Sequence, residues 1–295
     1  MNDREATTSP ITWEYTPDLT DPVVVVGFHG WSNAGGVSSD TVEYLIDALK
    51  PRRFARLSEE LFINCTLERP IGHIEDGVIH DLESMNADLH DWNNPDGEHD
   101  LILLLGREPH YNWSGYSRIL LDAMDKLNAT RLYTIGGVQD TISHTVPPIV
   151  SVVASSPHIV AETARLDEGI RAADYYGPVS VHSFLIRACS EAGIEGVSLW
   201  GHVPAYLQKS PRVVAKMITI LNNAAVMDCP TDELTRKSIE MDRKIHDALV
   251  RDPNLKKFVE TVERRRDPVD PAGHADKVIR LNDFLHRDPQ GDTDR

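Results

Sequence analysis

The sequence predicts an α/β fold, in which helices enclose a sheet, followed by a helical C-terminal extension. First, an apolar run from Val23 to Val26 leads directly into the glycine-rich residues 27–36, and helical spacing of apolar residues follows at Val42, Leu45, Ile46 and Leu49. This order is typical of a β-loop-α unit. Second, residues 101–105 form another continuous apolar run, as expected of a strand covered on both faces. Third, only helical spacing is found after Pro230.

Turn signals divide the body of the chain into strands and helices. Residues 22–28 are apolar at every position and predict a central strand, with a short edge strand before it at 11–15. The turn-forming residues Asn93 to Gly97 predict a loop over residues 86–99. Short strands are expected at 61–64, 71–75 and 78–79, away from the main sheet. The remaining expected elements are strands at 100–105, 131–135, 149–154 and 197–203, and helices at 116–127, 181–192 and 211–222.

Three successive helical patterns follow Pro230. The first covers residues 231–250, and the others begin at Asp252-Pro253 and Asp270-Pro271, where an N-cap residue precedes a proline. Residues 288–295 are expected to lack regular structure. We therefore divide the chain into an α/β body, residues 1–225, and a helical extension, residues 226–295. Because the apolar stripes of these helices need burial, we expect them to pack on the body or on another copy, and we expect a homo-oligomer, a dimer or trimer.

The charge and the cysteine content narrow the classes of partner. The chain of 295 residues has a formal charge of −16, which disfavours binding to nucleic acid or to an anionic membrane. Its apolar runs are far shorter than the roughly 20 residues of a membrane helix, and its first residues lack the apolar core of a signal peptide. The three cysteines are scattered, as is typical of a reducing compartment. We therefore expect a cytoplasmic protein.

The sequence contains no complete catalytic, cofactor or metal motif. Gly30 to Gly35 satisfies the first half of a phosphate-binding loop, but Gly36 and Val37 stand where lysine and a hydroxyl residue would hold phosphate and magnesium. The G-x-S-x-G pentapeptide of α/β-hydrolases is missing. The 13 histidines form neither H-E-x-x-H nor H-x-H. We assign no catalytic residue, cofactor or metal ligand, and we leave enzymatic activity open while leaning against it.

Several loops at the predicted strand ends carry residues suited to a cleft. In open α/β sheets, ligands bind beyond the carboxyl ends of the strands. If the fold brings these loops together, Gly30, Glu108, Gly137 and His202 should lie along one rim. Each glycine or histidine also has a purely structural interpretation, as a turn residue or a hydrogen-bonded core residue. The candidate cleft consists of His29, Gly30, Trp31, Asn33, Gly35, Gly36, Glu108, Pro109, Gly136, Gly137, His144, Gly177, His182, His202 and Tyr206.

Together these loops resemble those of the proteasome assembly chaperone 2 family. The similar pieces follow in order over about residues 20–225: residues 27–35, 68–70, 106–109, 136–137, 177–178 and 201–206. The helical extension is similar to that of actinobacterial members. The resemblance implies a three-layer α/β/α sandwich with a mixed sheet, of the purine nucleoside phosphorylase-like kind, and self-association or pairing with a related chain. It also implies proteasome subunits as partners, although the chain ends at Arg295 without the hydrophobic-Tyr-X tail of some archaeal relatives.

Two hypotheses about function follow. The first, favoured by the resemblance and by the lack of a catalytic motif, is an assembly-chaperone-like protein that acts through protein–protein contacts. The alternative is a small-molecule-binding protein, or an enzyme resembling hydrolases or phosphorylases, that uses the strand-end loops. In that case His29, Asn33, Glu108 and His202 should line one pocket.

Overall fold

The computed structural model describes residues 10–95 and 97–264. Nine strands form one mixed sheet in the order β1-β3-β6-β7-β2-β8-β11-β9-β10. Its four central strands, β7, β2, β8 and β11, run parallel, and antiparallel pairings flank them on both sides. The strands are β1 (Ile11–Trp13), β2 (Val23–His29), β3 (Arg52–Ser58), β6 (Asn86–Trp92), β7 (Leu101–Arg107), β8 (Arg131–Asp140), β9 (Val150–Ala154), β10 (Ile170–Ala172) and β11 (Glu195–Pro204).

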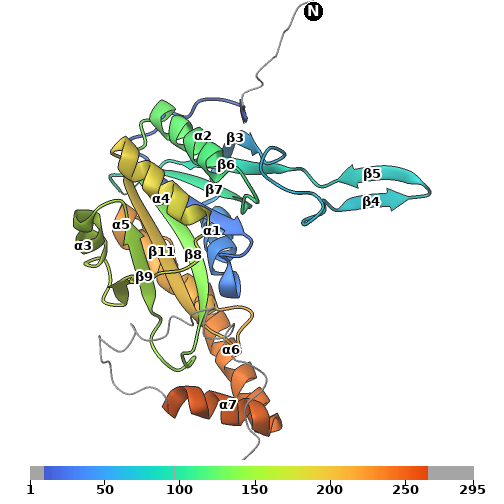
Figure 1. Ribbon diagram of the computed structural model, residues 1–295, viewed down its shortest axis with the longest axis vertical. Helices are drawn as coiled ribbons and strands as arrows, with labels where there is room; N and C mark the ends of the chain where they lie inside the picture. The colour runs from blue at the N-terminus through green and yellow to red at the C-terminus, as the bar shows by residue number, and fades with distance from the viewer. Residues whose placement is uncertain (1–9, 96, 265–295) are drawn as a thin grey trace, which may run out of the picture.

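Helices cover both faces of this sheet, so the body has three layers (Figure 1). One core lies between the sheet and helices α1 and α5, and a second core lies between the sheet and helices α2 and α4. The predicted α/β sandwich with a mixed sheet is confirmed. The helices are α1 (Val37–Leu49), α2 (Trp113–Lys126), α4 (Val181–Ala192) and α5 (Pro211–Ala225), with the short α3 (Pro157–Thr163) beside β9.

The central strand β2 shows why a continuous apolar run is needed. Successive side chains on a strand point to opposite faces. Val25 therefore enters the core beneath α1 and α5, whereas Val26 enters the core beneath α2 and α4. Gly27 lets α1 cross close to the strand, because a Cβ at this position would lie 2.6 Å from the Ser38 carbonyl oxygen and 2.7 Å from the Val42 side chain. The strand and the helix that follows it are thus fitted together at a residue without a side chain.

A two-stranded hairpin, β4 (Gly72–Glu75) and β5 (Val78–Leu82), projects from the body, and we call it the arm (Figure 1). Its turn residues Asp76 and Gly77 have φ values of 50° and 76°, which is typical of a type I′ turn. The two predicted short strands at this position, away from the main sheet, are confirmed. Every residue of both strands is exposed in this chain, so the arm is held only through its own pairing and its base.

Two of the predictions near the arm are wrong. Residues 61–64 form turns, because the amides of Phe62 and Ile63 both donate to the Glu59 carbonyl and both side chains are buried. Residues 86–92 form strand β6, with alternating buried residues that include Ala87 and Leu89, so the predicted loop begins only after Trp92.

The sequence pattern also misses three elements entirely. In β3, a bulge between Arg53 and Ala55 interrupts the alternation, so that Phe54 and Ala55 are adjacent and both buried. Strand β10 has three residues and helix α3 has seven, which is too short for a periodic signal.

The extension continues the body as helices α6 (Asp232–Arg251) and α7 (Pro253–Arg264). Helix α6 packs along α5 and buries Leu234, Ser238 and Ile245. The third expected helix, from Asp270-Pro271, and the segment 288–295 lie outside the described residues. The boundary between residues 225 and 226 stays a prediction. In the part of the chain that the structure describes, no helix is both long and apolar enough to cross a bilayer.

The contact of β2 with α1 leads to a first prediction. Gly27→Ala should lower the free energy of unfolding by about 1–3 kcal/mol, because the added methyl group overlaps the Ser38 carbonyl and Val42. Urea unfolding followed by circular dichroism measures this loss. Gly72→Ala is the matched control: its Cβ would meet nothing closer than 3.6 Å, and we expect a change within about 0.5 kcal/mol. Equal effects of the two substitutions would contradict the prediction.

Candidate functional site

The loop between β2 and α1 lies against the ends of β7 and β8. Gly137 donates its backbone N–H to the Ser32 carbonyl over 2.8 Å, and Asn33 forms a β-bridge with the same glycine. Gly30 has a φ of 145°, and a Cβ there would lie 2.6 Å from the Glu108 side chain. Three segments that are far apart in the sequence thus place Gly30, Asn33, Glu108 and Gly137 at one rim of the sheet.

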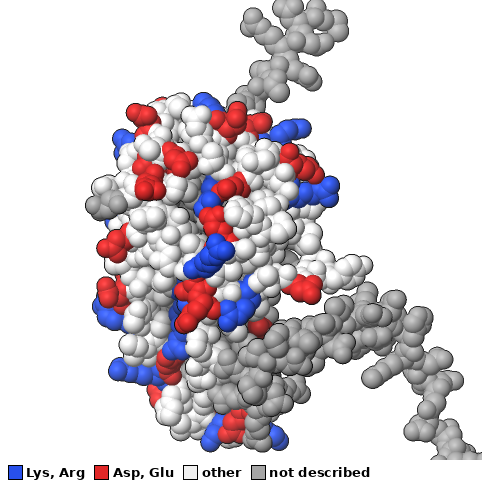
Figure 2. Space-filling view, turned by 90° about the vertical axis from the view of Figure 1, so that its left-hand side faces the viewer, with Lys and Arg blue, Asp and Glu red and all other residues white. Residues whose placement is uncertain are grey.

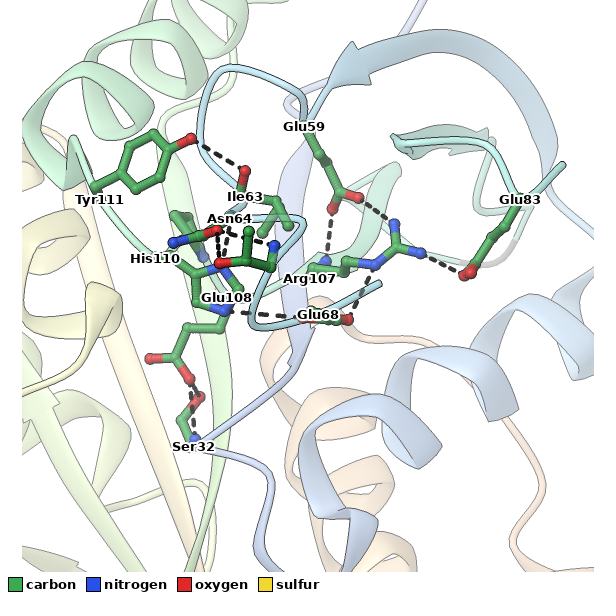
Figure 3. A network of polar contacts seen from close by, with 12 residues as sticks. Ser32, Glu59, Ile63, Asn64, Glu68, Glu83, Arg107, Glu108, His110 and Tyr111 are labelled. Atoms are coloured by element: carbon green, nitrogen blue, oxygen red, sulfur yellow. Dashed lines mark hydrogen bonds and ion pairs between the residues drawn. The ribbon is translucent and has the colours of Figure 1, made fainter. Parts of the chain in front are cut away.

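A buried chain of hydrogen bonds runs through this rim. The backbone N–H of Ser32 donates to Glu108 Oε2 over 3.1 Å, and the Ser32 hydroxyl lies 3.2 Å from the same oxygen (Figure 3). His182 Nε2, on α4, lies 3.1 Å from the Ser32 hydroxyl. The other ring nitrogen, Nδ1, lies 3.0 Å from the Thr134 hydroxyl on β8, which donates to Ser198 on β11 over 2.8 Å. We call these five residues the rim network.

The rim network is closed to solvent. Ser32 and His182 are each 1% exposed, and the His182 ring is flanked by the rings of Phe28 and Trp200. Burial lowers the pKa of His182 to about 3, so the imidazole is neutral at pH 7. Ser32 has a histidine and a carboxylate beside it, as a nucleophile would, but a substrate has no access to its hydroxyl. The network therefore joins the loop to the end of β7 and to α4, β8 and β11.

A second group of candidate residues lies between the β8–β9 loop and the start of α5. The Tyr206 hydroxyl lies 2.7 Å from His144 Nδ1 and accepts the His144 backbone N–H over 2.8 Å. Arg212 donates to the His144 carbonyl over 2.8 Å and pairs with Asp242 on α6. These contacts tie the extension to the body. The cavity between them is about 30 Å³, which is room for one or two water molecules.

The third group is centred on His202. Its Nδ1 lies 2.8 Å from Asp140 Oδ2, and its Nε2 lies 2.7 Å from the Ser151 hydroxyl. Among these residues, His202 is predicted from the sequence, whereas Asp140, Ser151 and the buried Ser32 are not. No motif connects Asp140, Ser151 and His202, because they come from β8, β9 and β11 and meet only through the register of those strands. Ser32 could have been found, since it lies within the glycine-rich segment.

The other candidate residues have separate surroundings. His29 lies 3.7 Å from Glu43 at the surface, and Trp31 is 70% exposed. Gly177 lies in the segment before α4, beside the Tyr175 ring. The predicted shared pocket is therefore divided into three clusters and several surface positions. The remaining candidates are Gly35 against Val203, Gly36 against Asp40, Gly136 beneath the Trp200 ring, and Pro109, whose carbonyl accepts the Trp113 indole N–H.

Arg107, the residue before Glu108, holds the base of the arm. Its guanidinium lies among Glu59, Glu68 and Glu83, with nitrogen–oxygen distances of 2.8 Å to Glu59 and 3.0 Å to Glu68 (Figure 3). Glu83 directly follows the arm, and burial raises the pKa of Glu59. Two consecutive residues at the end of β7 therefore connect to different parts: Arg107 to the arm and Glu108 to the rim network.

Among the described residues there is no evident metal site, and charges of both signs mix on one face of the molecule (Figure 2). Among residues 10–95 and 97–264, no three His, Cys, Asp or Glu side chains are grouped to hold a metal ion. On the face shown in Figure 2, lysines and arginines lie among aspartates and glutamates instead of forming a continuous positive patch.

The buried histidine predicts a pH dependence. The folded-state pKa of His182, about 3, lies below its unfolded value of about 6.5. The unfolded chain therefore binds the proton more readily, and the histidine's contribution to stability is lost as pH falls below about 6.5. Between pH 7.5 and 4.5, the wild type should lose about 2–3 kcal/mol relative to His182→Gln, which does not titrate. Urea unfolding at both pH values measures this difference.

An exposed histidine provides the control for this measurement. His158 has a side chain that is 83% exposed, and His158→Gln should track the wild type at both pH values. A stability difference between the wild type and His182→Gln that stays constant from pH 7.5 to 4.5 would show that His182 is not a buried neutral group.

Several solved structures are similar to this protein. A proteasome-assembly chaperone homologue from Mycobacterium tuberculosis is 27% identical, with a TM-score of 0.72, covering 80% of this chain and 99% of that chain. A PAC2 family protein from Streptomyces avermitilis is also 27% identical, with a TM-score of 0.69 over 77% of this chain and 95% of that chain. Pyrococcus furiosus PbaB, an archaeal proteasome activator, is 20% identical, with a TM-score of 0.66, covering 81% of this chain and 97% of that chain. At this identity the similarity is one of fold alone.

The family match covers most of the body and most of α6. No curated protein matches the sequence. The model of the PAC2 family matches residues 27–249, which include the β2–α1 loop, the rim network and the His202 cluster. The chain belongs to the PAC2 family.

Proposed function

We propose that this protein is an assembly-chaperone-like protein that acts by binding other proteins, with proteasome subunits as its clients. The observation that carries this proposal is the match of the PAC2 family model over residues 27–249. The Mycobacterium tuberculosis homologue, whose length is covered almost completely, supports the same role. A cytoplasmic location is part of the proposal, in keeping with three cysteines that are all free thiols.

The arm provides a surface suited to such binding. Ile74 faces Ile79 across the hairpin, and Leu82 lies on the same face beside Gly72. These three aliphatic side chains are 61–66% exposed, and their face carries no charge. A hairpin face of this composition is normally buried against another surface. In a chain with a charge of −16, an uncharged face is also where another acidic protein, including a second copy, meets least repulsion.

The strand-end loops favour protein binding over a small-ligand site. The rim loops contact one another directly, and Ser32 between them is 1% exposed. The cavity beside His144, at about 30 Å³, is far below the roughly 300 Å³ of a typical small-molecule pocket. An open groove does run between α2 and α4, but none of the candidate cleft residues lines it. These features support contact through exposed surfaces.

The arm face can be tested by paired charge substitutions. Ile74→Asp combined with Ile79→Asp should reduce recovery of proteasome subunits from host lysate at least about tenfold, because the apolar contact becomes charged. Quantitative mass spectrometry of the captured proteins measures this recovery. Both positions are well exposed, but the two aspartates face each other across the hairpin, so the unfolding free energy should fall by no more than about 1 kcal/mol.

Val78 provides the matched control. Val78 pairs with Glu75 on the opposite face of the same hairpin. Val78→Asp adds one negative charge, as the single Ile74→Asp substitution does, but it leaves the Ile74 face unchanged. We expect recovery close to that of the wild type. If the wild type recovers no proteasome subunit under gentle conditions, the proposed client is wrong; if all variants recover subunits equally, the arm is not the contact.

We further propose that the chain forms a dimer or trimer. Light scattering at micromolar concentration should give a mass of at least twice 33.0 kDa. The Ile74→Asp/Ile79→Asp variant should shift toward the monomer if the same face joins the copies. A strict monomer at these concentrations would rule out self-association as part of the mechanism.

A further inference from the structure

Ser151, His202 and Asp140 lie side by side on three neighbouring strands. β11 lies between β8 and β9. The three side chains share the sheet face on which α4 packs. On that face, Trp200 of β11 contacts His182 of α4, and Ser198 of β11 accepts a hydrogen bond from Thr134, the partner of His182. In the ladder, His202 pairs with Val138, and Trp200 pairs with Ser151. Asp140 and Ser151 are therefore diagonal neighbours of His202, one on each side.

The hydrogen bonds give each nitrogen of His202 a defined role. Asp140 is fixed through Oδ1, which accepts the Thr141 backbone N–H over 2.6 Å. Its Oδ2 lies 2.8 Å from His202 Nδ1. Because a carboxylate can only accept, the proton of the neutral imidazole resides on Nδ1. Nε2 is then an acceptor, and it lies 2.7 Å from the Ser151 hydroxyl. This is the arrangement in which a histidine removes a proton from a serine.

Exposure distinguishes this cluster from the rim network. The side chain of His202 is 20% exposed and that of Asp140 is 36% exposed, whereas Ser32 and His182 are closed off. Ser151 is half-buried, and two valines on the same sheet face are exposed: Val153 on β9, and Val138, which pairs with His202. The Ser151–His202 pair is therefore partly open to solvent, which the Ser32–His182 pair is not.

We propose that Ser151 is a nucleophile for acyl transfer from small, activated acyl esters, with His202 as its general base and Asp140 as a positioning residue. Nothing in the assembly-chaperone role requires this activity, and it stands or falls independently of that role.

The reaction balances with these groups and water alone. Ser151 Oγ attacks the carbonyl carbon, its proton passes to His202 Nε2, and a new Oγ–C bond forms. The ester C–O bond then breaks, and the departing alcohol takes the proton from Nε2. Water attacks the acyl-serine, gives a proton to the same nitrogen, and the Oγ–C bond breaks. The proton returns to Ser151, and the products are the alcohol and the carboxylic acid.

The position of Ser151 in the sheet determines the class of substrate. β9 pairs with β10 on one side and with β11 on the other, so the amides beside Ser151 are engaged in the ladders and do not form an oxyanion hole. Loss of one such donor costs about 10²–10³ in rate. Arg171 lies directly across from Ser151 on β10, but its guanidinium donates to the carbonyls of Glu168 and Ile170, so it does not replace the missing donors. We therefore expect slow turnover, limited to esters with good leaving groups, and no cleavage of peptides.

A fluorophosphonate probe tests the nucleophile directly. Attack by Ser151 Oγ on phosphorus forms an Oγ–P bond and releases fluoride, while His202 takes the proton. We expect the folded wild-type chain to gain the mass of one probe less HF, located at Ser151 by peptide mass spectrometry. Ser151→Ala should gain none, and His202→Gln should react at least about a hundredfold more slowly. Hydrolysis of p-nitrophenyl acetate should fall in parallel.

Further variants separate chemistry from folding. Asp140→Asn should slow the maximal labelling rate at least about tenfold at an unchanged melting temperature, whereas a purely structural role would lower the melting temperature without slowing the folded fraction. Ser114→Ala, an exposed serine on α2, should behave as the wild type. Because the decisive measurement uses the wild type, it does not depend on any variant folding. The absence of a Ser151 adduct, or labelling that persists in Ser151→Ala, would overturn the proposal.

Discussion

The structure depends on one buried chain of hydrogen bonds, the rim network, which holds the β2–α1 loop against the sheet. Ser32 brings this loop into contact with Glu108 from β7 and His182 from α4, and Thr134 continues the chain into β8. A buried polar group without a partner costs about 1–3 kcal/mol. Removing one side chain of the network would therefore leave its neighbour unpaired at that cost. The histidine within this network is neutral at pH 7. The result is a closed rim, with rigid loops and an inaccessible hydroxyl at its centre.

The molecule contains two serine–histidine pairs, and their surroundings give them different properties. Ser32 and His182 lie where desolvation keeps the imidazole uncharged and solvent is excluded. Ser151 and His202 lie at the open end of the same sheet face, with a carboxylate that sets the position of the proton. Residue type and distance are nearly the same in both pairs. Access and the third partner decide which pair can react, and neither can be read from the sequence at the serine itself.

The sequence predicts those elements in which the pattern of apolar residues is uninterrupted. The apolar runs of β2 and β7, and the helical spacing of α1, α2, α4 and α5, are each uninterrupted. Strands β3 and β6 are not predicted, because their patterns are interrupted. A bulge breaks the alternation of buried and exposed residues in β3. In β6 a charged residue, Asp91, is buried, because Arg52 and Tyr15 bind its carboxylate. At the site, glycines and Glu108 are found at predicted strand ends. Asp140 and Ser151 are not, since strand register alone brings them to His202.

The three thiols differ in a way that makes the arm accessible to spectroscopy. Cys189 and Cys229 are buried, and burial raises their pKa values to about 12 and about 11, whereas Cys65 is exposed. Since the thiolate is the reactive form, a maleimide dye attaches to the native chain chiefly at Cys65. Asn64 and Glu68, on either side of it, are fixed by His110 and Arg107. A dye at Cys65 would therefore lie near the base of the arm. Its fluorescence quenching or anisotropy should change when another protein binds the arm.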